Sequence, residues 1–140
     1  MIKTMNKLPC ITILRPWANL IADGLKTIET REDSRFKSLV GKRIGIHAAR
    51  KYDNEVDKKT LWSRNRWKVW EDRYYYESPG CIIATAYVQG IIKNLTAEFK
   101  MHTLCECAGK TGIFLADINK LENPIPAKGQ QGIWYYKGGI

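Results

Sequence analysis

The sequence predicts an α+β domain built around a small β-barrel of about five to six short strands, with a short helix near the amino terminus and a longer inserted helix. Three observations support this prediction. The 140 residues fit a single domain, residues 1–140, and 44% of them are hydrophobic, which suffices for a conventional core. Short runs rich in Ile, Val, Thr and Tyr are separated by turns that contain Gly or Pro. Two other stretches show the helical period instead.

The first predicted strand is Cys10–Leu14, and a short helix follows it. Pro16 suits the first helical position, because its missing N–H would be unpaired there in any case. Trp17 opens an apolar stripe with the i, i+3, i+4 spacing of a buried helical face. Gly24 is expected to end this helix in the left-handed conformation.

Lys26–Arg31 is predicted as a strand with polar residues on both faces. By the two-residue period, Thr27, Glu29 and Arg31 fall on one face. A core strand is usually apolar on at least one face, so we expect this strand to line a cleft or the mouth of the barrel.

The remaining strands follow from alternation and from β-branched content. Residues Glu32–Val40 are expected to form a polar loop, and Asn123–Pro126 an extended, irregular segment. Gly90 indicates a bulge or tight bend inside its strand. The predicted strands are Arg43–Ala48, Cys81–Ile92, Ile113–Ile118 and Ile133–Tyr136.

A long helix is predicted from Asp53 to about Tyr76, within an insertion of about residues 52–77. Trp67, Trp70 and Tyr74 share its apolar face, so packing on its own barrel is the first interpretation. A track for phosphates and a docking surface for a protein partner stay open as alternatives. Its cations are Lys58, Lys59, Arg64, Arg66, Lys68 and Arg73.

The chain is strongly basic, with 23 Lys and Arg against 14 Asp and Glu and a formal net charge of +9. This surplus attracts polyanions such as RNA, although solubility alone is an alternative explanation. No window approaches the ~18 apolar residues of a membrane span, so no membrane partner is expected. Met1–Cys10 lacks the apolar core of a secretory signal, which predicts a cytoplasmic protein with reduced thiols.

Four segments in this order resemble the ASCH domain family. Residues 15–18 read R-P-W-A, and residues 24–31 resemble the family signature G-x-K-T-x-E-x-R. Residues 46–49 resemble its I-H-A strand, and residues 123–134 its ending P-x-P-x-K-G-x-x-G-x-W. The segment from about Tyr52 to Tyr76 matches no such motif.

The resemblance implies a PUA-like β-barrel with a helix across its side and a cleft near the G-x-K-T-x-E-x-R strand. It also implies binding of RNA or of another nucleic acid. Some small members of the family are amidohydrolases that remove an acyl group from the exocyclic nitrogen of cytidine, and others have been proposed to cleave RNA. Fold similarity alone does not choose among these functions.

Lys26, Glu29 and Arg31 are the first candidates for the site. A lysine ammonium in a cleft can hold a phosphate, and when desolvated it can act as a base or nucleophile. Glu29 can pair with Lys26, either as a catalytic partner or in an ion network that holds the cleft walls. The Arg31 guanidinium can bind a carboxylate or a phosphate through two parallel hydrogen bonds.

Further candidate ligand residues are Trp17, Thr27, His47, Lys128 and Gln130. Trp17 either stacks on a base at the cleft rim or packs in the core. His47 either faces a ligand or is a structural histidine bonded to backbone. Lys128 and Gln130 lie in a glycine-containing loop that can approach a phosphate or close the barrel.

We therefore expect an RNA-binding or modified-nucleobase-binding domain with a basic cleft, and whether it is also an enzyme stays open. An amidohydrolase would use Lys26 as base or nucleophile with Glu29. However, Glu29 stands where those members carry a threonine, and Ala84–Gln89 lacks the expected carboxylate. His102, Cys105 and Cys107 fit no common zinc spacing, so neither a metal nor a cofactor is expected. A regulatory module that binds a protein partner through the 53–76 helix is the third alternative.

Overall fold

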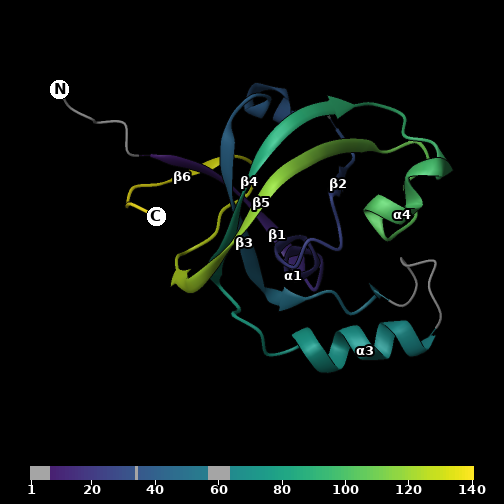
Figure 1. The fold of residues 1–140 in the computed structure, drawn as a ribbon, viewed down its shortest axis with the longest axis horizontal. Helices are drawn as coiled ribbons and strands as arrows, with labels where there is room; N and C mark the ends of the chain where they lie inside the picture. Colours follow the sequence, from purple (N-terminus) through teal and green to yellow (C-terminus); the bar gives the residue numbers. More distant parts are fainter. Residues whose placement is uncertain (1–6, 34, 57–63) are drawn as a thin grey trace.

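The computed structural model describes residues 7–33, 35–56 and 64–140 (Figure 1). The helices and strands, in chain order, are β1 (Leu8–Arg15), α1 (Trp17–Ala22), β2 (Ile28–Arg31), η1 (Arg35–Leu39), β3 (Arg43–Tyr52), α3 (Arg64–Tyr74), β4 (Cys81–Ile92), η2 (Ala97–Phe99), α4 (Lys100–Thr103), β5 (Thr111–Pro126) and β6 (Trp134–Tyr136).

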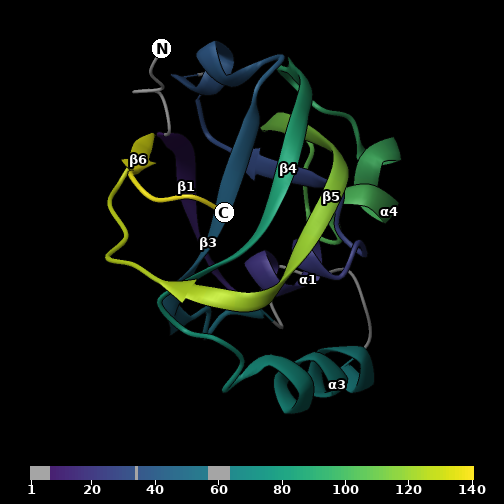
Figure 2. The ribbon, with the colours of Figure 1, turned by 60° about the vertical axis from the view of Figure 1, so that its left-hand side comes forward.

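The six strands form one mixed sheet in the order β2-β5-β4-β3-β1-β6. β1 and β3 are parallel, and the other neighbouring strands are antiparallel. Figure 2 shows β1, β3, β4 and β5 side by side, with β6 beyond β1. The α+β class is confirmed, whereas the prediction of a closed barrel is wrong, because β2 and β6 end the sheet without pairing with each other.

The sheet stays open between β1 and β2. β6 pairs with β1 only at Leu8–Cys10, so the rest of that edge of β1 has no backbone ladder on this side. β2 faces this part of β1 across a hollow lined by both strands. The Arg31 guanidinium crosses the gap and donates to the Thr12 carbonyl oxygen at 3.2 Å. We call this gap between β1 and β2 the seam.

Helix α1 lies against the sheet with every residue buried. Its apolar side chains share one core cluster with residues of β1, β3, β4 and β5. The predicted left-handed residue after the helix is present, since Gly24 has φ 78°. The predicted irregularity at Gly90 is also present as a register shift between Val88 and Gly90.

β5 is longer than predicted, and 123–126 is strand rather than irregular chain. Pro126 and Ile125 pair with β4, opposite Cys81 and Ile82. β2 covers β5 only at residues 111–114, so the far end of β5 is an edge where prolines are tolerated. Similarly, the expected loop after β2 contains η1, which buries Phe36 and Leu39.

The inserted helix packs on its own domain, as the first interpretation predicted. Trp70 is 4% exposed and meets Trp17 edge-to-face, with ring centroids 6.1 Å apart. The Tyr74 hydroxyl donates to Asp23 at 2.6 Å. Part of the predicted helix, with Lys58 and Lys59, lies outside the described residues. Among the described helices, none is both long enough and apolar enough to cross a bilayer.

Candidate functional site

Two hollows meet on one side of the sheet. The larger, of about 1250 Å³, lies among β1, β3, η1 and the loop of residues 126–132. The smaller, of about 400 Å³, lies in the seam and reaches Trp17. Thr12 and Arg31 line both, so the hollows adjoin at the side-chain bridge described above.

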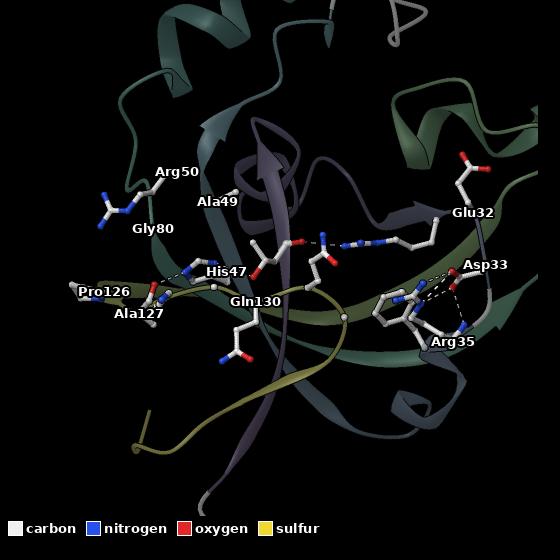
Figure 3. A pocket seen from close by; sticks show the side chains of 17 residues that line it. Glu32, Asp33, Arg35, His47, Ala49, Arg50, Gly80, Pro126, Ala127 and Gln130 are labelled. Carbon is white, nitrogen blue, oxygen red and sulfur yellow. Dashed lines mark hydrogen bonds and ion pairs between the residues drawn. The ribbon is translucent and has the colours of Figure 1, made fainter.

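The larger hollow has a cationic lining. Figure 3 shows Arg50 and Gly80 at one end and Glu32, Asp33 and Arg35 at the other, with His47 and Gln130 between them. Arg35 is neutralised by Asp33, at 2.9 Å. Within the described part of the chain, no ion pair joins Arg50 to a carboxylate. The larger hollow is lined by four cations and two carboxylates: Arg31, Arg35, Arg50 and Lys128, with Glu32 and Asp33.

A chain of hydrogen bonds fixes the floor of the larger hollow. Trp134 Nε1 donates to Thr12 Oγ1 at 2.9 Å, and Thr12 Oγ1 lies 3.2 Å from His47 Nδ1. His47 Nε2 lies 2.8 Å from the Ala127 carbonyl oxygen, which only accepts, so Nε2 carries the hydrogen. With this hydrogen on Nε2, Nδ1 can accept from the Thr12 hydroxyl. With 2% exposure, His47 mainly holds backbone and Thr12 in place.

The loop that carries Lys128 and Gln130 passes directly over this imidazole. A Cβ on Gly129 would lie 2.7 Å from both His47 Cε1 and Thr12 Oγ1, so a larger residue would displace the loop or the histidine. Lys128 and Gln130 are exposed and both line the larger hollow. The loop thus presents one cation and one amide to the hollow from a position fixed by close packing.

The smaller hollow contains a buried ion cluster. Lys26 is 1% exposed, and its Nζ donates to the Thr103 carbonyl oxygen at 2.6 Å. The same Nζ lies 3.9 Å from Glu29 Oε1 and 5.2 Å from the centroid of the Trp17 ring. Glu29 Oε2 lies 3.2 Å from Arg31 Nε. Lys26, Glu29 and Arg31 are therefore gathered as the two-residue period and the spacing predicted.

Trp17 packs in the core and also lines the smaller hollow. Its ring is 7% exposed and belongs to the main core cluster, yet it also lines the smaller hollow. Its Nε1 donates to Asp53 Oδ2 at 2.9 Å, which fixes the ring at the bottom of the hollow. Asp53, expected only as a helix cap, is therefore a wall residue of this site as well.

Thr27 is the one ligand candidate that lines neither hollow. The strand begins at Ile28, and Thr27 lies in the irregular segment before it, where its N–H donates to the His102 carbonyl oxygen at 2.9 Å. The two-residue period therefore does not extend back to Thr27. Thr30 supplies a hydroxyl to the smaller hollow instead.

Several lining residues were missed as site candidates from the sequence, among them Thr12, Arg35 and Arg50. Thr12 lies in an ordinary apolar strand, and Arg50 follows the I-H-A segment as one exposed cation among many. These residues come together only because the fold places distant segments side by side, and no local sequence pattern predicts that proximity.

The cysteines are free thiols. Burial raises the pKa of the Cys10 thiol to about 11, against a smaller lowering by hydrogen bonds from the Tyr136 and Gly45 backbone. Cys105 and Cys107 are buried as well. Across residues 7–33, 35–56 and 64–140, no three His, Cys, Asp or Glu side chains gather in a way that could hold a metal ion.

Comparison with known proteins identifies the family to which this chain belongs. The ASCH domain model matches residues 11–133, and the chain belongs to the ASCH domain family, which is PUA-like. A crystal structure of ASCH from Zymomonas mobilis is similar in fold, with a TM-score of 0.60 at 17% identity, over 91% of this chain and 86% of that one. A mutant of the same Zymomonas mobilis protein gives 0.59 at 16% identity, over 96% and 91%.

Proposed function

We propose that this ASCH domain binds RNA, or a modified nucleobase within RNA, across the two adjoining hollows. The observation that carries the proposal is the cationic lining of the larger hollow, where Arg50 and Lys128 have no carboxylate partner among the described residues. Phosphates bind such cations with release of counterions, a term that dominates nucleic-acid affinity. The exposed backbone of the 128–132 loop adds donors beside them.

The smaller hollow suits one base of the bound strand. Its charged lining balances three cations against three carboxylates: Lys26, Arg31 and Lys110 against Glu29, Asp53 and Glu106. A balanced, polar wall disfavours phosphate but offers donors and acceptors to the edge of a base, and the Trp17 ring adds an aromatic surface. Arg31, shared by both hollows, would contact the link between the base and the backbone.

A salt titration tests this proposal. Fluorescence anisotropy with mixed-sequence single-stranded RNA should show affinity falling by orders of magnitude between about 50 and 200 mM salt if several phosphates are bound. Arg50→Ala and Lys128→Ala should each weaken binding and reduce the salt slope by about 1. Lys93→Ala is the matched control, because Lys93 is exposed and lines neither hollow. Absence of binding at low salt would rule the proposal out.

A second candidate function is hydrolysis of an acylated cytidine or of RNA. It is favoured by the presence of an ammonium, a buried carboxylate and a hydroxyl in one hollow, namely Lys26, Glu29 and Thr30. Nucleophilic catalysis needs these groups within hydrogen-bond reach of one another. Strand β4, which should supply the carboxylate in such an amidohydrolase, has none in Ala84–Gln89 and lines no part of this hollow, so Glu29 or Asp53 would have to supply it.

Stoichiometric protein incubated with acylated cytidine, and separately with single-stranded RNA, tests this second candidate. Turnover that is lost in Lys26→Met and kept in Lys93→Met would support it. Intact substrates after long incubation would leave binding as the function of the site.

A further inference from the structure

A pair of exposed tyrosines follows helix α3. Tyr75 is 43% exposed and Tyr76 is 87% exposed, although large aromatic side chains are usually covered. The two rings meet at 85° with centroids 4.9 Å apart. In such an edge-to-face pair, one ring has both of its faces uncovered by the other. The exposure of Tyr76 shows that its faces are also largely uncovered by the rest of the protein.

This pair is held in place by its surroundings. Tyr75 leans on Tyr52 of β3, with ring centroids 5.2 Å apart. Its N–H donates to the Glu71 carbonyl oxygen at 3.1 Å. The Tyr75 carbonyl oxygen in turn accepts from the buried Arg15 guanidinium. A ring on a fixed backbone loses little conformational freedom on binding, which favours its use in recognition.

Arg15 places the tyrosine pair next to the cationic end of the larger hollow. Its guanidinium donates to carbonyl oxygens of both chain segments: Ala49 and Arg50 at the end of β3, and Tyr74 and Tyr75 at the end of α3. One planar group therefore joins the backbone of Arg50 to the backbone of Tyr75. The Arg50 side chain lines the hollow and lies against Gly80, in the segment that leads from α3 to β4 (Figure 3).

Two cations of α3, Lys68 and Arg73, already have carboxylate partners. Lys68 pairs with Glu71 and Asp72, at 3.8 and 3.2 Å. Arg73 pairs with Asp23 at 3.4 Å. These two cations are thus less available to phosphates than Arg50, and the aromatic pair that follows α3 lies beside Arg50.

We propose that Tyr75 and Tyr76 form a stacking platform for unpaired bases of a single RNA strand that leaves the larger hollow past Arg50. The proposal rests on the function proposed above and extends it to a strand class, single-stranded rather than duplex RNA. Bases stack on tyrosine faces without sequence preference, while a neighbouring cation holds the phosphate between them. A duplex keeps its bases stacked on one another and has no free base face to offer.

The test compares three probes of equal strand length: an adenosine-rich single strand, the same backbone without bases, and an RNA duplex. Tyr76→Ala should weaken binding of the single strand by about 5- to 100-fold. Tyr76→Phe, which keeps the ring, should stay within about twofold of the wild type. Tyr135→Ala is the matched control, since Tyr135 is 53% exposed and lines neither hollow. Binding of the abasic backbone should be the same for wild type and Tyr76→Ala.

The salt slope provides a second readout. Tyr76→Ala should lower affinity without changing the slope, whereas Arg50→Ala should reduce the slope. Equal affinity of Tyr76→Ala and wild type for the single strand, or an equal loss with the abasic backbone, would overturn the platform. If Arg50 and Lys128 variants still weaken binding in that case, the proposed function stands without it. If the wild-type protein binds none of the probes at low salt, the proposed function itself fails.

Discussion

The imidazole of His47 donates from Nε2 to the carbonyl oxygen of Ala127 at 2.8 Å, across 80 positions of the sequence. This bond ties the middle strand β3 to the loop that carries Lys128. Since His47 is 2% exposed, the loop is positioned by an interior side chain rather than by its own turn chemistry. The shape of the larger hollow therefore depends on the packing beneath it.

Replacing His47 should loosen this loop. His47→Ala leaves a cavity, unpairs the Ala127 carbonyl and removes the His47 contact of the Thr12 hydroxyl, which keeps Trp134 as a partner, so we expect a loss of about 2–4 kcal/mol in the free energy of unfolding. Urea denaturation monitored by tryptophan fluorescence measures this loss of stability. His47→Gln, whose amide can donate and accept, should recover part of the loss. Full stability of the alanine variant would contradict the role assigned to this bond.

Gly129→Ala should disturb the same loop from the other side. The new Cβ would lie 2.7 Å from the His47 ring and from Thr12 Oγ1, closer than real contacts allow. Relieving this clash should lower the free energy of unfolding by about 1–3 kcal/mol and weaken the binding of any ligand held by Lys128. Gly90→Ala is the matched control, because its Cβ would meet nothing within 4 Å. Thermal unfolding and fluorescence anisotropy with RNA measure the stability and the RNA affinity of both variants. Equal stability and affinity of Gly129→Ala and Gly90→Ala would count against the close packing at Gly129.

The buried ion cluster should respond asymmetrically to neutralisation. Glu29→Gln leaves the Lys26 ammonium, which is 1% exposed, without its carboxylate partner. We expect this to lower the free energy of unfolding by about 3–5 kcal/mol. Lys26→Met should cost less, about 1–2 kcal/mol, because Glu29 retains Arg31 and only the Thr103 carbonyl loses its donor. The double variant should lose less than the two single variants combined. A double-mutant cycle by urea denaturation tests this order, and additive losses would show that the pair is not coupled.

Asp23 should give the domain an acid-sensitive contact between α1, α3 and β5. Burial by itself would raise the pKa of Asp23, but hydrogen bonds from Lys120 and Tyr74, with the charges of Lys120 and Arg73, lower it below its usual value. The unfolded chain then binds the proton more readily. The stabilisation is therefore present above the usual carboxyl pKa and is lost as pH falls through the lower, folded value.

Asp23→Asn should accordingly be less stable than wild type by about 1–2 kcal/mol at pH 7, and the difference should shrink as pH falls below about 4. Urea unfolding at several pH values measures this. Asp72→Asn, which breaks the exposed pair with Lys68 on the same helix, should change stability by less than about 1 kcal/mol. A difference between Asp23→Asn and wild type that stays constant across the pH range would contradict the lowered pKa.

Local pattern was sufficient to place several elements and motifs. β4 has the bounds that its β-branched run predicted, Cys81–Ile92, and α1 ends before a left-handed Gly24. Both depend on interactions between residues near in sequence. The gathering of Lys26, Glu29 and Arg31 was also predictable, because short spacing on and before a strand brings them together.

The remaining features depend on contacts between distant residues. Lysine is almost never fully buried without a partner, and the partner of Lys26 is the carbonyl of Thr103, 77 positions away. The far end of β5 is strand because it pairs with β4 at Cys81 and Ile82, and because β2 does not reach it, Pro124 and Pro126 lie on an edge. Closure of the sheet likewise depends on whether β1 and β2 pair, and local periodicity does not predict which distant strands pair.

The seam gives this sheet a property that a fully laddered barrel lacks. Widening a closed barrel requires breaking a row of backbone hydrogen bonds, whereas across this gap the described residues form one strand-to-strand hydrogen bond, from Arg31 to Thr12. Rotation of the Arg31 side chain would therefore change the aperture between β1 and β2. The cost of that rotation is set by the ion pair of Arg31 with Glu29, at 3.2 Å, rather than by a backbone ladder.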